Sequence, residues 1–323
     1  MVQELNQQGY VVDYCDLWKV TGADIDWNAY DIVIDNWDNL KYAPPESRPT
    51  KVAFMNGWYW LEQNSRELER IRWFKERTGI IVPPNRQVAP NFSDEYADYL
   101  TYYGTQMQAD SFSSKPKKHL INLCGLCGPA PTYQKKDIAK SRNTFMWIGG
   151  GGMLHKGLDI IMEAFARIPE ATLIIAGNPK EEPRFWQWAE PMLAHHHNLK
   201  WIGWADTTSA EFDTVANQCI ATVYASCSEG GPATVARVLF NGQIPIVTKT
   251  SFVRAESLGY LIEGDTYNQL LTATINQVRH VMNLPTADLA QKSEAVRDFA
   301  ERNHTREAFT ESFRSLLKNI QHS

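Results

Sequence analysis

The sequence predicts an α/β protein with two domains, each built on a parallel β-sheet that helices cover on both faces. Short apolar runs alternate with amphipathic helical stretches along most of the chain, an order typical of parallel sheets. The chain has 323 residues, which is about twice the usual length of a single globular domain, so two domains are expected.

The alternation of strands and helices is clearest in the second half of the chain. Each apolar run there is followed by a turn of glycine or small residues and then by a helical stretch, such as LDIIMEAFARI or PATVARVLF. In parallel sheets ligands bind at the carboxyl ends of the strands, so the residues that follow these runs should line one crevice. The predicted strands lie at 145–150, 171–177, 198–204, 221–226 and 244–249.

The first half of the chain is less regular but has the same order. It opens with a helical stretch, VQELNQQ, and a turn at Gly9, where such a domain normally opens with a strand and a glycine loop, so we expect the first strand to be missing. A charged helix is predicted at 62–79. The predicted strands are GYVVDYC (9–15), YDIVIDNW (30–37), KVAFMNG (51–57), ADYLTYYG (97–104) and HLINLCG (119–125).

The domain boundaries follow from the linker and from the helical end of the chain. Segment 129–143 contains prolines and charges that suit an exposed linker. After Asn283 the pattern is wholly helical, with a break at His304 and with Thr305 as an N-cap. We therefore predict an N-terminal domain at 1–135, a C-terminal domain at 136–302 and a final helix at 303–323.

Composition limits the function classes. The 32 basic and 37 acidic residues give a net charge of -5, without the uniform positive field of nucleic-acid binding proteins, so no nucleic-acid partner is expected. Five cysteines, an odd number, suit a reducing cytoplasm. Cys124 and Cys127 form a C-x-x-C pair that we interpret as ordinary thiols, with a redox or zinc pair as the alternative. No apolar run is long enough for a bilayer span, so a soluble intracellular protein is predicted.

The most informative motif is IGGGGMLHKGLD at 148–159. Its glycines let a backbone approach a phosphate, the helix that follows offers free N–H groups, and Lys156 adds a positive charge, so the motif indicates an anion site. It is not a Walker loop, because Gly157 follows the lysine, nor a dinucleotide fingerprint, because Leu154 and His155 take the place of the third glycine. The alternative is a glycine-rich loop with an exposed lysine.

A second motif, YASCSEGGPATVARVLF, follows the predicted strand at 221–226. Glu229 lies in the turn, Gly230 and Gly231 expose their amides, and Pro232 suits the first position of a helix. A carboxylate beside free amides can accept hydrogen bonds from sugar hydroxyls while the amides donate to others. The alternative is that Glu229 only caps the helix.

The order of GGGGMLHKGLD, LIIAGNP, IGW and SCSEGGPATVARVLFNGQIPIV resembles the donor-binding half of the retaining GT-B glycosyltransferases, specifically glycosyltransferase family 4 (glycosyl transferases group 1). The resemblance is strong over about 140–265 and weaker over 9–128. It implies a GT-B fold, in which two Rossmann-like α/β domains face a cleft and a C-terminal helix crosses back, here in an N-terminally shortened form.

The resemblance also implies roles for individual residues. Lys156 would hold the donor diphosphate and Glu229 would contact the donor sugar, so these two are the predicted catalytic residues. The family has an arginine where this chain has Gly151, and a second glutamate where it has Arg237. The full predicted donor-binding set is Gly150, Gly151, Gly152, Lys156, Gly177, Asn178, Trp204, Ala205, Glu229, Gly230, Gly231 and Arg237.

The function implied by the resemblance is that of a retaining hexosyltransferase. It would move a sugar from a uridine or guanosine diphosphate donor to a glycan, a lipid-linked acceptor or an envelope polysaccharide, with no metal and no cofactor, and no enzymic nucleophile is assigned. The alternative is a degenerate, non-catalytic GT-B protein that only binds a sugar nucleotide. A D-x-D pair, Asp24 and Asp26, would be the metal site of a different class of transferase, which we disfavour.

Two basic segments bear on localisation. KPKKH (115–119) and QKKDIAK (134–140) are interpreted as ordinary solvated loops, and contact with anionic lipids is the alternative, since many relatives act on lipid-linked acceptors. The prediction is a cytoplasmic protein, with peripheral contact to the inner face of the membrane as the alternative.

Overall fold

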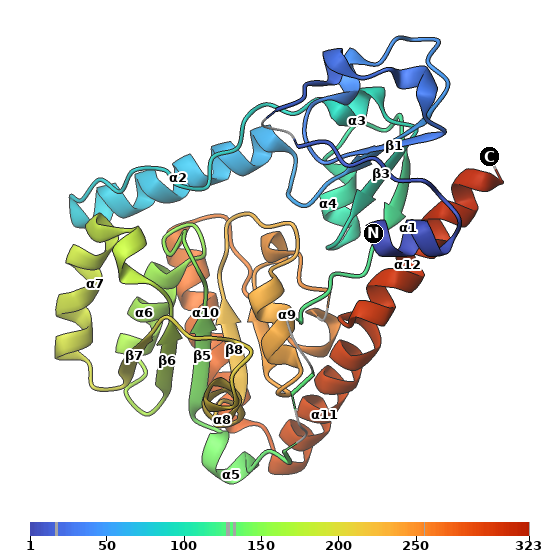
Figure 1. Cartoon of the computed structure of the whole chain (residues 1–323). Coiled ribbons are helices and arrows are strands. Elements are labelled where there is room, and N and C mark those ends of the chain that lie inside the picture. Colours follow the sequence, from blue (N-terminus) through green and yellow to red (C-terminus); the bar gives the residue numbers. More distant parts are fainter. Residues whose placement is uncertain (17–18, 127–129, 132–133, 255, 323) are drawn as a thin grey trace.

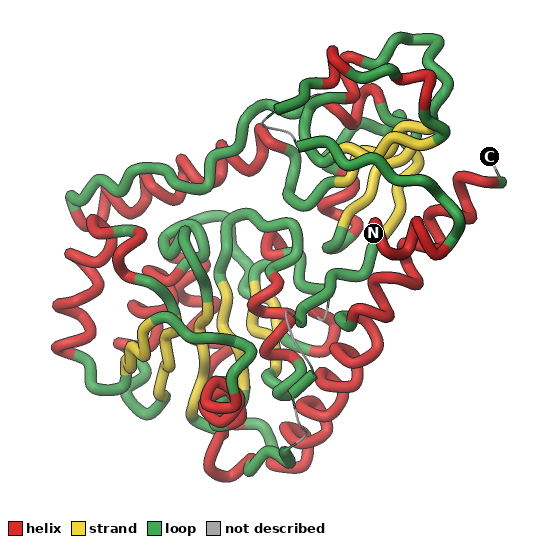
Figure 2. The backbone as a smooth tube through the Cα atoms, in the orientation of Figure 1, coloured by secondary structure: helices red, strands yellow, loops and turns green. Residues whose placement is uncertain are grey.

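The computed structural model describes the chain except for residues 17–18, 127–129, 132–133, 255 and 323. Each half of the molecule holds a parallel sheet with helices around it (Figures 1 and 2). The predicted architecture of two α/β domains is therefore confirmed.

The first sheet has four strands in chain order, all parallel. Val52, Ala53 and Leu100 on the two central strands are fully buried, whereas the flanking strands are half-buried over most of their length. The strands are β1 (Ile32–Asp35), β2 (Thr50–Phe54), β3 (Tyr99–Tyr102) and β4 (Lys117–Leu120).

The prediction of a strand at 9–15 is wrong. Residues 10–16 form no regular structure, and Val11 and Tyr14 are 96% and 85% exposed. Val11 and Tyr14 therefore cover no apolar surface. Tyr10 packs instead beside the final helix, where its hydroxyl accepts a hydrogen bond from Gln321.

The second sheet has six parallel strands in the order β10-β9-β8-β5-β6-β7. All five strands predicted for this half are present, and the short β10 is an addition. Its central strands are almost wholly buried, which explains their apolar, β-branched sequences. The strands are β5 (Thr144–Ile148), β6 (Thr172–Ala176), β7 (Leu199–Gly203), β8 (Ala221–Tyr224), β9 (Ile244–Val247) and β10 (Tyr260–Leu261).

The α-helices surround both sheets and end in a long helical segment (Figure 1). Among the residues that the structure describes, no helix is long and apolar enough to cross a membrane. The helices are α1 (Val2–Gln7), α2 (Trp60–Thr78), α3 (Ser93–Tyr96), α4 (Gln106–Asp110), α5 (Ile138–Ser141), α6 (Leu158–Ala166), α7 (Pro183–His195), α8 (Ala210–Asn217), α9 (Ala233–Leu239), α10 (Tyr267–Asn283), α11 (Thr286–Asn303) and α12 (Arg306–Gln321).

The final helix crosses back onto the first domain, as predicted. Thr305 is its N-cap, with Oγ1 accepting a hydrogen bond from the Ala308 amide at 3.1 Å. Phe313 and Leu316 of α12 are fully buried in the cluster that contains Val52 of β2. Figure 1 shows α11 and α12 running from the second half to the first.

Helix α2 also crosses between the halves, but in the other direction. It begins beside the first sheet and extends over the second half as far as α7 (Figure 1). Phe74 is fully buried there, 5.8 Å from the ring of Phe185 and 5.4 Å from that of Trp188. Residues 80–92 then run back along α2, so we refer to residues 60–92 as the arm.

Charged contacts dock the arm onto the second half. Arg77 Nη2 lies 2.5 Å from Asp159 Oδ2 in the first turn of α6, and Arg70 Nη2 donates to the Ala225 carbonyl at 3.1 Å. Asp159 is fully buried, and its burial raises the pKa of the carboxyl while the two arginines lower it. The carboxylate of Asp159 thus pairs with two arginines of the arm, Arg77 and, at 3.9 Å, Arg70.

Candidate functional site

Four loops meet along one edge of the second sheet. Strands β8, β5, β6 and β7 are adjacent and parallel, so their carboxyl ends lie at the same edge. This topology brings the predicted donor-binding residues other than Arg237 to one edge of the sheet, from loops far apart in the sequence. The loops carry Gly150–Gly152 and Lys156 after β5, Gly177 and Asn178 after β6, Trp204 and Ala205 after β7, and Glu229–Gly231 after β8.

Lys156 is a buried lysine just before the start of α6. Its side chain is 8% exposed, and no hydrogen bond or ion pair joins its Nζ atom to another residue in the described part of the chain. Burial lowers the pKa of Lys156, the nearby charge of Glu229 raises it and that of Arg86 lowers it. Lys156 is thus poised to receive an anion from outside the protein.

Glu229 has a fixed carboxylate at the end of β8. Its Oε1 atom accepts hydrogen bonds from the Tyr224 hydroxyl at 2.7 Å and from Ser226 Oγ at 3.2 Å, and its amide donates to the Thr250 carbonyl at 3.1 Å. These are not the contacts of a helix cap, because α9 begins at Ala233 and has no side-chain cap. Oε2 has no hydrogen bond to a described residue and can accept one from a ligand.

The glycine loop after β5 is narrow and partly occupied by acidic side chains. Gly150 has open space beside it, while a side chain at Gly151 would meet the carboxylate of Glu181. The amides of Met153 and Leu154 donate to the carboxylate of Glu182, so part of the anion-binding capacity of this loop is used within the protein.

The loops after β6 and β7 differ in exposure. Gly177 is buried against Gly149, and Asn178 donates to Glu181 Oε1 at 3.3 Å. Trp204 is 70% exposed and Ala205 is half-buried. The indole of Trp204 is therefore free to stack on a flat ligand, such as a base.

Gly230 and Gly231 lie where the two halves touch. A Cβ atom on Gly230 would collide with the carbonyl of Asn56 in the loop after β2, so only glycine allows this approach. Gly231 has a φ of 118° and packs against Tyr103 from the end of β3. The loops after β2 and β3 thus close over the start of α9.

Arg237 makes a set of internal contacts. Its Nε donates to the Thr207 carbonyl at 2.9 Å, Nη1 to Asn241 Oδ1 at 2.9 Å and Nη2 to Asp213 Oδ1 at 2.6 Å. These bonds join α8 to α9. A role toward the ribose stays a prediction, and only the remaining N–H groups of Arg237 could serve it.

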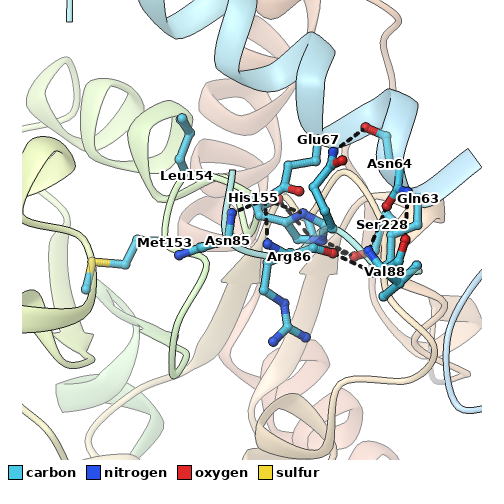
Figure 3. A network of polar contacts seen from close by, with 12 residues as sticks. Gln63, Asn64, Glu67, Asn85, Arg86, Val88, Met153, Leu154, His155 and Ser228 are labelled. Atoms are coloured by element: carbon cyan, nitrogen blue, oxygen red, sulfur yellow. Dashed lines mark hydrogen bonds and ion pairs between the residues drawn. The ribbon is translucent and has the colours of Figure 1, made fainter. Parts of the chain in front are cut away.

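Three residues at this edge escaped the sequence analysis. His155 donates from Nε2 to the Ser228 carbonyl at 2.5 Å, and its Nδ1 lies 4.0 Å from Glu67 Oε1 on the arm. Burial lowers the pKa of His155. Arg86 lies over the glycine loop (Figure 3). His155 could have been found from the sequence, because it lies next to Lys156 in the glycine motif. No sequence signal connects Glu67 or Arg86 to that motif.

The other candidates of the sequence analysis have local roles. Asp24 accepts hydrogen bonds from Thr21, and Asp26 from the Asn28 amide, and no group of three metal-ligand side chains occurs within the described ranges. The Lys136 ammonium of the second basic segment donates to two carbonyls of the second half, and burial lowers its pKa to about 8, so it is not a free surface charge. Cys127 of the C-x-x-C pair lies outside the described residues.

A pocket of about 420 Å³ lies between the arm and the second sheet. It adjoins the turn that carries Glu229, because Cys227 and Thr250 belong to its wall. Lys156 and Glu229 are not among its lining residues. The lining consists of Arg66, Glu69, Arg70, Trp73, Cys227, Thr248, Lys249, Thr250, Ile262, Glu263, Gly264, Asp265 and Leu270.

Two parallel-sheet domains and a final helix that returns to the first domain define the GT-B fold of glycosyltransferases. The chain is similar to the pneumococcal O-GlcNAc transferase GtfA, solved with UDP and GlcNAc, at 14% identity and a TM-score of 0.53, covering 85% of this chain and 53% of GtfA. It is similar to sucrose-phosphate synthase from Thermosynechococcus elongatus at 15% identity and a TM-score of 0.58, covering 86% and 69%. The corresponding values for WaaG, a glycosyltransferase involved in lipopolysaccharide biosynthesis, are 14%, 0.55, 88% and 77%.

These likenesses establish the fold alone. The chain spans about half the length of GtfA. No protein-family model matches the sequence, and no curated protein sequence matches it.

Proposed function

We propose that the protein transfers a sugar from a nucleotide-diphosphate donor to a carbohydrate or lipid-linked acceptor. The observation that carries the proposal is the meeting of Lys156 and Glu229 at the carboxyl ends of β5 and β8. One is a buried lysine whose Nζ has no hydrogen bond or ion pair to a described residue, and the other is a carboxylate whose Oε2 accepts no hydrogen bond from the described part of the chain. Together they suit the two parts of a sugar nucleotide, its diphosphate and its hydroxyl-bearing ring.

During transfer, Lys156 and Glu229 would act on different parts of the donor. The bond between the anomeric carbon and the diphosphate oxygen breaks, the acceptor oxygen bonds to that carbon, and the acceptor proton leaves with the nucleoside diphosphate. Lys156 would stabilise the negative charge that builds on the leaving diphosphate. Glu229 Oε2 would accept a hydrogen bond from a hydroxyl of the sugar and orient the ring. Retention at the anomeric carbon, metal independence and membership of family 4 are part of the proposal, and they rest on the motif order.

Thermal unfolding with a panel of uridine and guanosine diphosphate-sugars in EDTA tests the proposal. A donor that binds only the folded state raises the melting temperature. Lys156→Ala should remove most of that shift, because a charge-assisted hydrogen bond contributes about 1.5–3 kcal/mol. Lys318→Ala, which removes an exposed lysine of α12, is the matched control. An unchanged shift in Lys156→Ala would contradict the diphosphate assignment.

Release of nucleoside diphosphate in the presence of acceptors then separates the two functions open to this fold. Binding with release indicates a transferase, whereas binding without release favours a sugar-nucleotide binding protein that does not catalyse transfer. Loss of binding in EDTA would instead support a metal site at Asp24 and Asp26.

A further inference from the structure

Arg86 brings a second positive charge to the glycine loop, and it comes from the arm. A Cβ atom on Gly152 would lie 2.8 Å from Arg86 Cγ and 3.0 Å from Cδ, so the aliphatic part of the arginine covers the loop backbone. Gly152 has a φ of 85°. Figure 3 shows the guanidinium of Arg86 extending away from α2, toward the strand ends of the second sheet.

The backbone around Arg86 is fixed, but its charged group is not. Glu67 Oε1 accepts hydrogen bonds from the amides of Asn85 and Arg86 at 3.0 and 2.8 Å, and Gln63 Nε2 donates to the Arg86 carbonyl at 2.8 Å (Figure 3). The next residue of α2, Asn64, makes two hydrogen bonds of 2.9 Å with the backbone of Val88, two residues after Arg86. These bonds hold the main chain and leave the guanidinium of Arg86 exposed, without a hydrogen bond or ion pair to any described residue.

The protein thus brings two cations to one loop, and neither has a hydrogen bond or ion pair to a described residue, although the carboxylates of Glu229, Glu182 and Glu181 also act on Lys156. Arg86 is near enough to Lys156 to disfavour its charged form, as it also does for His155. Like charges held together without an anion repel each other, and this repulsion ends when a ligand with two or more negative charges lies between them. A guanidinium is suited to that ligand because its planar fork binds two phosphate oxygens at once.

We propose that Arg86 is a second diphosphate-binding residue, so that the arm completes the donor site from the other half of the molecule. This rests on the proposed function, since the ligand is the diphosphate of the donor. Gly150, Gly151 and Gly152 provide no positive side chain on the loop itself. Arg86 supplies that charge from the arm, which Arg70 and Arg77 join to Asp159 of the second half.

Docking of the arm and binding of diphosphate are then linked. A ligand that contacts both Lys156 and Arg86 binds the docked state better than an undocked one, and it must stabilise docking by the same factor. We therefore expect pyrophosphate to slow hydrogen exchange of the Asn85 and Arg86 amides, which donate to Glu67.

Calorimetric titration of the whole chain with inorganic pyrophosphate, UDP and uridine tests the proposal without knowledge of the sugar. Arg86→Ala should weaken pyrophosphate and UDP about tenfold or more and leave uridine unchanged. Arg86→Gln, which keeps the length of the side chain, should weaken them similarly. Arg72→Ala is the matched control, because this arginine is exposed on α2 and pairs only with Glu69 and Glu76 among the described residues.

The outcomes separate Arg86 from the site as a whole. If Arg86→Ala binds pyrophosphate as tightly as the unaltered protein while Lys156→Ala does not, Arg86 is not a ligand residue and the proposed function stands. If Arg86→Ala loses uridine and pyrophosphate equally, the side chain only holds the arm, which also overturns the proposal. If the unaltered protein binds neither pyrophosphate nor UDP, both proposals fail.

Discussion

At the scale of single residues, the two carboxylate oxygens of Glu229 differ: Oε1 is bonded to the protein, whereas Oε2 has no hydrogen bond to a described residue. Oε1 is held by Tyr224 and Ser226, so the rotamer is set before any ligand arrives. A carboxylate oriented in this way accepts a hydroxyl hydrogen bond at little entropic cost.

Glu229→Gln should therefore weaken the binding of a sugar nucleotide more than the binding of the bare nucleotide. The amide keeps the shape but has only one acceptor atom, so a UDP-sugar should bind about tenfold more weakly while UDP is little affected. Calorimetric titration of the variant with both ligands measures the difference. Equal weakening of the two ligands would show that Glu229 only shapes the turn.

His304 makes the junction of α11 and α12 sensitive to acid. It is 4% exposed, its Nδ1–H donates to the Leu123 carbonyl at 2.9 Å, and burial lowers the pKa of its imidazole from 6.5 to about 4. The unfolded chain takes up a proton below pH 6.5 and the folded chain does not, so the contribution of His304 to stability is lost as the pH falls from 6.5 to 4.

Urea unfolding at pH 7 and pH 5 measures this loss. We expect His304 to account for about 2 kcal/mol of the decrease in unfolding free energy between these pH values. His304→Gln, which can still donate to Leu123, should reduce the decrease by that amount. If the two proteins lose the same free energy, the pKa of His304 is not lowered by the fold.

At the scale of elements, α2 shows where the sequence is informative and where it is not. Its length and its end are readable, because the charged helical pattern stops at Gly79, which has a φ of 73°. Its packing is not readable from apolar periodicity, because the buried stripe of the helix is mainly polar. That stripe consists of Gln63, Glu67, Arg70 and Phe74.

The same contrast applies to the sheets and the site. Strands β5, β6, β8 and β9 could be predicted because they are buried on both faces over nearly all of their residues and are therefore apolar. The segment at 9–15 has an apolar pattern too, but it forms no regular structure, and its contacts, such as that of Tyr10 with Gln321 of α12, cannot be predicted from that pattern. Lys156 and Glu229 could be found from local motifs, whereas Arg86 could not, because the approach of the arm depends on polar pairs such as Arg77 with Asp159.

Asp159→Asn tests how the arm is held. The substitution leaves Arg70, whose side chain is 2% exposed, without a counter-ion, and we expect a loss of about 3–5 kcal/mol in unfolding free energy together with faster proteolysis within 60–92. Glu76→Gln, which breaks an exposed pair with Arg72, should cost less than about 1 kcal/mol. A loss in Asp159→Asn as small as in this control would show that apolar contacts such as those of Phe74 hold the arm.

At the scale of the whole molecule, two helices interlock the halves. The arm carries residues of the first half onto the second, and α12 carries the end of the chain onto the first sheet. The loops after β2 and β3 add contacts at Gly230 and Gly231. Because each half supplies part of the surface of the other, relative motion of the sheets must break buried contacts at several places, and a ligand between Lys156 and Arg86 would further favour the closed arrangement.

The two sheets should nevertheless differ in local stability. The first sheet has short strands, its flanking strand β1 is half-buried over three of its four residues, and the outer edge of β1 has no strand partner in the described part of the chain. Residues 10–16 add no regular hydrogen bonds beside it, whereas strands β8 and β9 of the second sheet are buried throughout and paired on both sides. Amides with few buried neighbours open by local fluctuation, at a lower free energy than global unfolding. We therefore expect hydrogen exchange, followed by mass spectrometry at neutral pH, to be faster in residues 9–57 than in residues 145–249. Equally slow exchange in both segments would mean that α12 and the arm stabilise the first sheet as strongly as the six-stranded core stabilises the second.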